Sequence, residues 1–154
     1  MNIPVSLPLD NDGFLRRECP SCRQQFKWHN GPANDEAEGQ ASAELYFCPF
    51  CGQSAAPDQW LTGEQLAYIQ GAAMPGIMRL VDDELSSLFK GMNSKHLKVK
   101  QTGHLDVPDE PDALIEPDDM AIVASPCHGW EPIKVPDDIA SPVHCLVCGR
   151  PFAL

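Results

Sequence analysis

Two short cysteine pairs in the first third of the chain have the residue types and the spacing of a metal site. Cys19-Pro-Ser-Cys22 is followed, after 25 intervening residues, by Cys48-Pro-Phe-Cys51. Two such pairs can bring four thiolates round one ion, in the tetrahedral arrangement of structural zinc. Gly52, just after the second pair, can adopt the positive φ that such turns often need. A redox Cys-x2-Cys motif would need one pair at a helix start in a βαβ pattern, so a closed zinc site is expected.

The remaining three cysteines predict a second zinc site near the C-terminus. Cys145 and Cys148 repeat the paired spacing, and Cys127 stands upstream of them. The residue that would complete a Cys-x2-Cys pair with Cys127 is Trp130, which cannot bind a metal ion. A histidine must therefore supply the fourth ligand, and the expected cofactors are two Zn²⁺ ions per chain. The alternative is a degenerate site without metal, in which the three thiols are buried and free.

Two histidines compete for the fourth position of the second site. His128 directly follows Cys127, and His144 directly precedes Cys145. Neighbouring side chains in a strand point to opposite faces, which disfavours His144 if the chain enters Cys145 as a strand. A proline and a glycine bracket Cys127 and His128 in a turn where consecutive side chains can converge. The sequence therefore favours His128 and leaves His144 open.

Short strands must position the first two cysteine pairs. Residues 14–18 and 25–28 have the patterns of strands that enter and leave the first pair, and residues 45–47 of a strand that enters the second. The intervening residues 30–44 carry four acids and no periodicity, which indicates an irregular loop.

This order of strands and Cys-Pro-x-Cys turns, over roughly residues 14–60, resembles the zinc-ribbon family. The resemblance implies a small β module held together by zinc through Cys19, Cys22, Cys48 and Cys51. It does not imply one function, because ribbons occur in nucleic-acid-binding proteins, enzyme subunits and protein-docking modules. Rubredoxins share the two-pair arrangement and hold iron, but Arg23 stands where their usual glycine would follow the first pair.

A long amphipathic helix is predicted after the first module, over residues 63–92. Thr62 and Gln65 have the spacing of a capping box, and apolar residues then recur at three- and four-residue steps. Pro75 predicts a bend near residues 74–76. Packing against the zinc modules would be the ordinary use of the apolar stripe, but such small modules offer little core to cover so long a helix. We therefore expect a surface for a protein partner, with a homodimer as one form, at Ile77, Leu80, Leu85 and Leu88.

The rest of the chain has the pattern of a second β module. Four segments have strand patterns: residues 96–100, 120–124, 132–135 and 142–144. The segment 106–119 is acidic and proline-rich, which indicates a solvated loop. The predicted fold is α+β, built from small zinc-stabilised modules: an N-terminal zinc ribbon (1–60), a helical linker or interaction helix (61–95) and a C-terminal ribbon-like β domain (96–154).

The chain is strongly acidic, with a formal net charge of −11, and this charge opposes binding to phosphate backbones. Two short segments of the chain are nevertheless rich in basic residues, and we call them the basic islands. Phe26 and Trp28 beside the first island are candidate stacking residues. A nucleic-acid-binding zinc ribbon is therefore the alternative function, acting through the islands at 16–27 (Arg16, Arg17, Arg23, Lys27) and 90–100 (Lys90, Lys95, Lys98, Lys100).

No arrangement of residues points to catalysis. Both predicted zinc sites are closed and rich in thiolates, whereas a catalytic zinc keeps one position open to water. The sequence has no His-Glu-x2-His motif and no phosphate-binding glycine loop. Metal-type cysteine spacing without a secretory signal, and the lack of a long apolar run, indicate a cytoplasmic protein that does not enter a membrane. The expected function is a non-catalytic zinc-binding adaptor or regulatory protein that acts through protein–protein interaction.

Overall fold

The computed structural model describes residues 4–154 of the chain. Two compact units divide these residues. The first, which we call the β unit, combines Leu7–Gly63 with Leu114–Leu154; the second, the helical unit, combines residues 4–6 with Glu64–Ala113.

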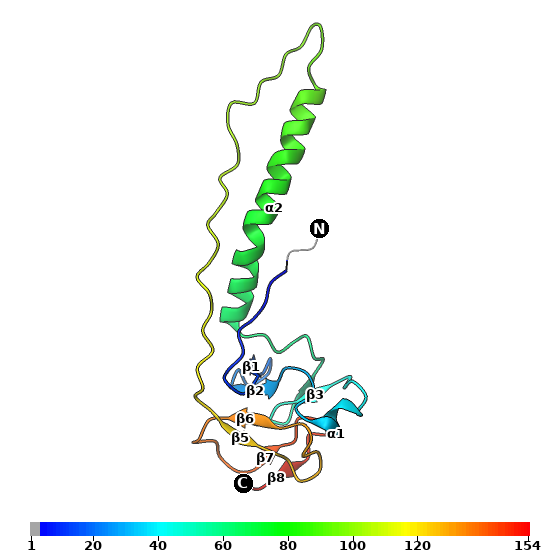
Figure 1. Cartoon of the computed structure of the whole chain (residues 1–154), viewed down its shortest axis with the longest axis vertical. Coiled ribbons are helices and arrows are strands. Elements are labelled where there is room, and N and C mark those ends of the chain that lie inside the picture. Colours follow the sequence, from blue (N-terminus) through cyan, green and yellow to red (C-terminus); the bar gives the residue numbers. More distant parts are fainter. Residues whose placement is uncertain (1–3) are drawn as a thin grey trace. The chain divides into compact units, whose positions relative to one another are not determined.

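The main sheet of the β unit has four antiparallel strands (Figure 1). The strands are β1 (Phe14–Glu18), β2 (Gln25–His29), β5 (Ala121–Val123) and β6 (Ile133–Val135), in the spatial order β1-β2-β6-β5. β2 pairs with β6, with Lys27 opposite Lys134 and Trp28 opposite Ile133. The sequence divides these strands between an N-terminal and a C-terminal module, but their backbone hydrogen bonds join them in one sheet. Local periodicity cannot reveal such pairing between distant segments.

Two short hairpins and one helical turn complete the β unit. β3 (Tyr46–Phe47) pairs with β4 (Ser54–Ala55), and β7 (Val143–His144) pairs with β8 (Pro151–Phe152). The helical turn, α1 (Asp35–Glu38), lies within residues 30–44, where the sequence predicts an irregular loop. That prediction is wrong for these four residues. The side chain of Asn34 caps α1 by accepting a hydrogen bond from the Ala37 amide at 2.9 Å, and acids in the first turn favour the helix further.

Aromatic rings and cysteines form the core of the β unit. Trp60 and Phe26 are fully buried, and Trp28 is 6% exposed. The Trp60 ring centroid lies 5.7 Å from that of Phe26 and 5.8 Å from that of Trp28, in edge-to-face arrangements. Phe26 and Trp28 are therefore core residues: Phe26 has no exposed surface, and the 6% that Trp28 exposes is too little for a nucleic-acid base to stack on its ring. The alternation along the strand, from which the sequence suggested stacking, fits a buried face equally well.

The helical unit consists mainly of α2 (Gly63–Gly91), which continues through Pro75 as one helix. The following chain turns back and runs along α2: Gln101 lies at Ser86, Leu105 at Asp82 and Pro111 at Gly71. We call residues 101–111 the return segment (Figure 1). The strand predicted over residues 96–100 is not present. Within residues 4–154, no neighbouring strand pairs with this stretch, and the amides of Leu97 and Val99 instead donate to the side chains of Ser94 and Asn93.

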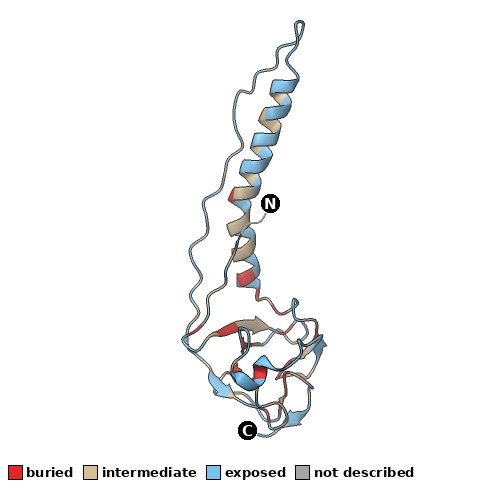
Figure 2. Cartoon of the chain, turned by 45° about the vertical axis from the view of Figure 1, so that its right-hand side comes forward, coloured by how far each residue is buried: buried red, intermediate tan, exposed pale blue. Residues whose placement is uncertain are grey.

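A stripe of large apolar side chains on the helical unit is exposed. Figure 2 shows α2 mainly as exposed and half-buried residues, and the only buried residues within it are Gln65 and Pro75. The exposed apolar side chains, which we call the apolar stripe, are Leu66, Met74, Ile77, Leu80, Val81, Leu88 and Met92. In the described part of the chain, none of the helices combines the length and the apolar character needed to cross a membrane.

Candidate metal centres

The three Cys-x2-Cys turns share one backbone geometry. In each, the carbonyl of the first cysteine accepts a hydrogen bond from the amide four residues later, at 2.8–2.9 Å. The amide of that cysteine donates to the carbonyl five residues later, at 2.9–3.0 Å. The residue after the second cysteine has a positive φ in all three turns: Arg23 (63°), Gly52 (73°) and Gly149 (75°). The positive φ expected at Gly52 is confirmed, and Arg23 adopts the same conformation in spite of its Cβ atom.

The sulfurs of the first two pairs meet at a spacing that fits zinc. The Sγ atoms of Cys19 and Cys51 are 3.7 Å apart, as are those of Cys22 and Cys48. All four ligand atoms lie within 4.8 Å of one another. A tetrahedron with Zn–S bonds of about 2.3 Å has S···S edges of about 3.8 Å. The distances are far longer than a disulfide bond of about 2.05 Å, so the cluster has the geometry of a metal site.

Burial and backbone amides determine the charge that this first cluster carries. Burial raises the pKa of the Cys48 thiol far above its usual range. Burial also acts on Cys19, but hydrogen bonds from the amides of Cys22 and Ser21 outweigh it and lower the pKa of that thiol. Four thiolates gathered at one point, two of them buried, need a compensating cation. Zn²⁺ supplies that charge, and its binding would release the remaining thiol protons.

The second cluster brings together Cys127, His128, Cys145 and Cys148. The Sγ atoms of Cys127 and Cys148 are 3.6 Å apart, and His128 Nδ1 lies 3.5 Å from Cys145 Sγ. For Zn–S bonds of about 2.3 Å and a Zn–N bond of about 2.0–2.1 Å, a tetrahedral S···N edge is about 3.5 Å. The four ligand atoms therefore also fit one Zn²⁺, with Nδ1 as the histidine ligand. Cys127 and Cys148 are exposed, so this site is more open to solvent than the first.

His144, the alternative ligand, lies outside this cluster. Its Nδ1 is 3.2 Å from the carbonyl oxygen of Pro49. Its ring also packs against Gly52, so closely that a Cβ atom there would come within 3.0 Å. His144 ends β7, and the side chain of Cys145 points the other way, as neighbouring residues at a strand do. The structure thus groups His128 with the three thiols.

Ser125 supports the second cluster and was missed by sequence reasoning. Its side chain is buried, its Oγ lies 3.2 Å from Cys145 Sγ, and it accepts a hydrogen bond from the His128 amide at 3.1 Å. Burial acts to raise the pKa of Cys127, but hydrogen bonding with His128, Cys148, Cys145 and Ser125 outweighs it and lowers that pKa to about 6. A serine two residues before a ligand is too common in turns to have signalled this role.

A third cluster of possible metal ligands in the β unit consists of three aspartates, and these bind the ammonium group of a lysine. The carboxylates of Asp10, Asp12 and Asp118 lie close enough together to bind a cation. Lys134 Nζ lies 2.9, 2.6 and 2.8 Å from them, and its side chain is 1% exposed. Because the ammonium already supplies the positive charge, these acids are not a candidate metal site.

The same ion-pair network includes half of the first basic island. Lys27 is fully buried, and its Nζ lies 3.2 Å from Asp10 and 3.0 Å from Glu116. Arg16 lies 2.9 Å from Glu116 and 2.7 Å from Asp119. Neither residue could contact a phosphate without losing these carboxylates. The acidic segment that the sequence predicts as a solvated loop is thus, at its end, part of the β unit.

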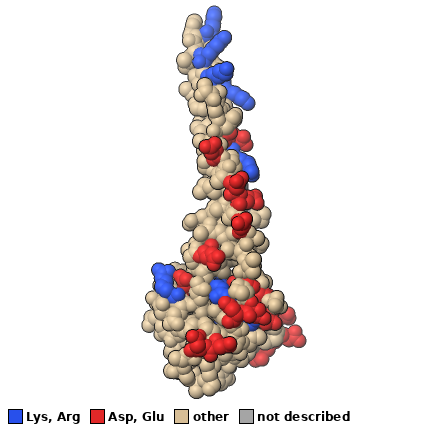
Figure 3. All heavy atoms as spheres, turned by 90° about the vertical axis from the view of Figure 1, so that its left-hand side faces the viewer, with Lys and Arg blue, Asp and Glu red and all other residues tan. Residues whose placement is uncertain are grey.

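The other basic residues differ in how far they are exposed. Arg17 lies over the Trp28 ring, 4.3 Å from its centroid, and burial lowers its pKa to about 10. The side chain of Arg23 is 74% exposed. The four lysines of the second island are all exposed, and Figure 3 shows basic side chains gathered at the end of the helical unit where the chain turns back.

The residues expected to face a partner are not equally available on α2. Ile77, Leu80 and Leu88 are exposed by 39%, 49% and 60% and belong to the apolar stripe. Leu85 is half-buried and lies beside this stripe.

Searches for related proteins do not add a function to this geometry. No family model, curated protein or solved structure matches the chain. The two cysteine clusters are consistent with zinc-binding modules.

Proposed function

We propose that this protein is a non-catalytic, zinc-ribbon-like protein that binds two Zn²⁺ ions and acts as an adaptor for a protein partner. The observation that carries the zinc part is the pair of four-ligand clusters, one of four cysteines and one of three cysteines with a histidine, whose ligand atoms lie within 4.8 Å of one another in each cluster. Each set has four protein ligands, whereas a catalytic zinc needs a position for water or substrate. Zinc in both sites would hold together the turns that the thiols occupy and would have a structural role.

The apolar stripe supports the adaptor part of the proposal. Single exposed apolar side chains are common, but these residues recur along one side of α2 at steps of three, four, seven and eight residues. The return segment binds a different side of the helix, through Gly71, Asp82 and Ser86. A continuous apolar side of this kind is suited to an amphipathic helix packed alongside it. A second copy of α2 is the simplest such helix, so a homodimer is one form that the proposal allows.

The ion pairs of the β unit favour this proposal over nucleic-acid binding. Arg16 and Lys27 are already paired with carboxylates, and the net charge of −11 opposes a phosphate backbone. Nucleic-acid binding, the alternative function, would therefore depend mainly on the exposed lysines at 90–100. We expect no measurable binding to mixed-sequence DNA or RNA at physiological salt, where screening acts beyond about 8 Å.

Two substitutions in the apolar stripe test the adaptor role. Leu80→Glu with Leu88→Glu should abolish a homodimer seen by light scattering, or the retention of a partner in pull-downs, while elemental analysis still finds two zinc ions. The control is Arg79→Gln with Lys90→Gln, which changes the net charge by the same amount on exposed residues outside the stripe. Assembly that survives in the stripe variant, or sub-micromolar binding to nucleic acid by the wild-type protein, would contradict the proposal.

A further inference from the structure

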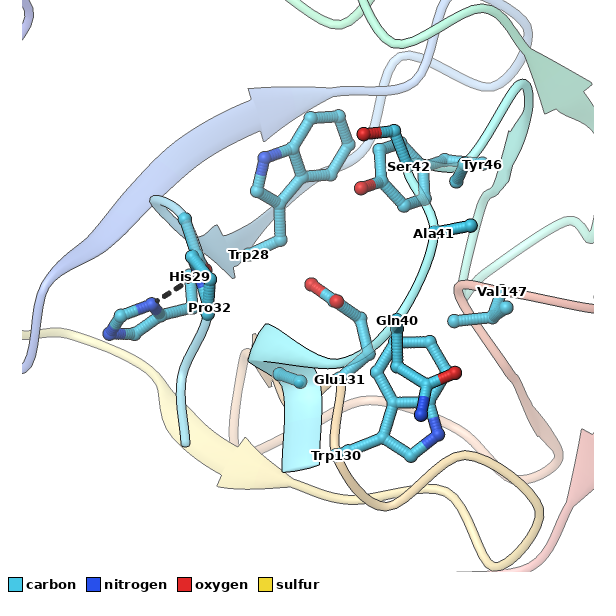
Figure 4. A pocket seen from close by; sticks show the side chains of 13 residues that line it. Trp28, His29, Pro32, Gln40, Ala41, Ser42, Tyr46, Trp130, Glu131 and Val147 are labelled. Carbon is cyan, nitrogen blue, oxygen red and sulfur yellow. Dashed lines mark hydrogen bonds between the residues drawn. The ribbon is translucent and has the colours of Figure 1, made fainter. Parts of the chain in front are cut away.

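The β unit contains a cavity that neither zinc site explains. Its volume is about 300 Å³, at the lower end of the range for small-ligand pockets. Residues from the loop around α1, from the ends of β2 and β3, and from the turn after His128 line it (Figure 4). The cavity could hold about ten water molecules, at about 30 Å³ each, which is enough for one small organic head group.

Three aromatic side chains form much of the cavity wall: Trp28, Tyr46 and Trp130. The ring centroids of Trp28 and Tyr46 are 4.7 Å apart, with an angle of 41° between their planes, so the two rings form a corner. Trp130 lies across the cavity from Trp28 in Figure 4. The His128 ring holds Trp130 edge-on, with centroids 5.7 Å apart at 82°. Aromatic faces carry partial negative charge and attract cations that lie over them. Because Arg17 already lies 4.3 Å over the Trp28 ring, the attraction for a ligand cation rests mainly on Tyr46 and Trp130.

A carboxylate completes the wall. Figure 4 shows the side chain of Glu131 pointing into the space between Trp28 and Trp130. Glu131 is half-buried, and its carboxylate has no ion pair or hydrogen bond with any residue in the described part of the chain. Burial raises the pKa of Glu131, and the nearby His29 ring acts in the opposite sense. The Nδ1 atom of His29, which also lines the cavity, lies 3.0 Å from the carbonyl oxygen of Gly31.

We infer that this pocket binds an alkylated ammonium group, such as the trimethylammonium head of a small molecule or of a methylated lysine. The ring faces attract a positive charge, and Glu131 supplies a counter-ion without needing a donor from the ligand. A fully alkylated nitrogen has no N–H donors. Its burial against an aromatic wall therefore leaves no hydrogen-bond donor unsatisfied. A neutral apolar ligand would leave the carboxylate unpaired in a drier site, and an anion would meet Glu131 directly.

The backbone of Glu131 links the pocket to the second zinc site. The Glu131 amide donates to the His128 carbonyl at 3.1 Å, which closes the turn that carries both pocket residues 130 and 131. Binding measurements therefore use the zinc-loaded protein, and each variant is first checked for two zinc ions. The inference does not depend on the adaptor role of α2, since none of the pocket residues belongs to the helical unit.

Two ligands of equal shape but different charge separate the contribution of charge to binding from that of shape. Choline and 3,3-dimethyl-1-butanol differ by the replacement of a charged nitrogen by carbon. Titration into zinc-loaded protein, followed by tryptophan fluorescence at constant ionic strength, should show saturable binding of choline and of tetramethylammonium. The neutral alcohol should bind at least about tenfold more weakly. Equal binding of choline and the alcohol, or no saturation by any cation, would overturn the inference.

Two isosteric variants test the carboxylate. Glu131→Gln keeps the shape of the pocket and should weaken choline binding by about tenfold. Glu44→Gln removes an equal charge from an exposed residue of the loop around α1 that does not line the cavity, and should leave binding unchanged. Unchanged affinity in Glu131→Gln, or an equal loss in both variants, would refute a specific role for Glu131.

The source of the ammonium group is decided by two further ligands. A short peptide with one trimethyl-lysine is compared with the same peptide carrying unmodified lysine, and both are compared with choline. Tighter binding of the trimethylated peptide than of choline indicates a protein ligand, and the reverse order indicates a small molecule. Preference for the unmodified peptide would contradict the alkylated-ammonium inference.

Discussion

Replacing Lys134 by methionine should destabilise the β unit, because its ammonium group lies among three carboxylates. The side chain of Lys134 is 1% exposed, and Lys134→Met removes the charge while keeping most of the apolar stem. Asp10 has a fully buried side chain, whereas Asp12 and Asp118 are 51% and 43% exposed. Water can therefore hydrate Asp12 and Asp118 in the variant, but not Asp10.

The expected cost follows from what remains around Asp10. Removing one partner of a buried ion pair costs about 3–5 kcal/mol. Lys27 still lies 3.2 Å from Asp10, so we expect the lower end, about 3 kcal/mol. Burial acts to raise the pKa of Asp10, but hydrogen bonds from Lys134, from the amides of Phe14 and Asp12, and from Lys27 lower it to about 2. Because this pKa lies below the ordinary 3.8, the stabilisation is present above pH 3.8 and is lost as the pH falls towards 2.

The assay is urea unfolding of the zinc-loaded protein at pH 7, followed by tryptophan fluorescence. Arg23→Met is the control, because it removes a cation whose side chain is 74% exposed and which lies 3.5 Å from Glu18, at a cost below about 1 kcal/mol. Adding Asp10→Asn to Lys134→Met should recover part of the lost stability. A loss below about 1 kcal/mol for Lys134→Met, or no recovery in the double variant, would refute the reasoning.

Three further predictions concern zinc and the turns that bind it. Elemental analysis should find two zinc ions per chain in the wild-type protein and in His144→Ala, but one in His128→Ala. Two ions in His128→Ala would show that His128 is not the fourth ligand. Removal of zinc by a chelator should abolish the near-ultraviolet circular dichroism of the β unit, since Cys19, Cys48 and Cys145 are buried, and an unchanged spectrum would rule out a structural role for the metal. Gly149→Ala should cost more than Gly31→Ala: both have positive φ, worth about 1–2 kcal/mol, but only at Gly149 does a new Cβ come within 2.5 Å of the Phe47 ring, which adds about 1–3 kcal/mol. Equal losses of stability in urea unfolding would show that this contact relaxes freely.

Local spacing was sufficient to predict the cysteine turns. Two cysteines three residues apart can reach one ion from a single turn, so Cys19 and Cys22 predict each other's role without reference to the rest of the fold. The same holds for the positive φ at Gly52, which is a property of the turn itself. The apolar periodicity after residue 63 likewise predicted a helix, and α2 ends within a residue of the predicted boundary.

Local spacing could not predict the role of residues that depends on partners far away in the chain. The sequence suggests a basic surface at Lys27 and Arg16, because two of the acids that pair with them, Glu116 and Asp119, lie about 100 residues further along the chain. The third acid, Asp10, pairs with Lys27 from the segment before β1. Residues 96–100 alternate like a strand, yet no strand in the described part of the chain pairs with them. Trp60, a fully buried aromatic residue, lies in a loop without periodicity and gave no signal.

The sequence by itself determined which side chains could bind metal and where the helix lies, because a chelating turn and a helical stripe are both properties of a few consecutive residues. The tertiary structure decided which histidine joins the second cluster, that β2 pairs with β6, and that Trp28, Tyr46 and Glu131 line one cavity. Each of these depends on contacts between segments far apart in the chain, and such contacts are selected by packing and backbone pairing, which leave no local spacing to read.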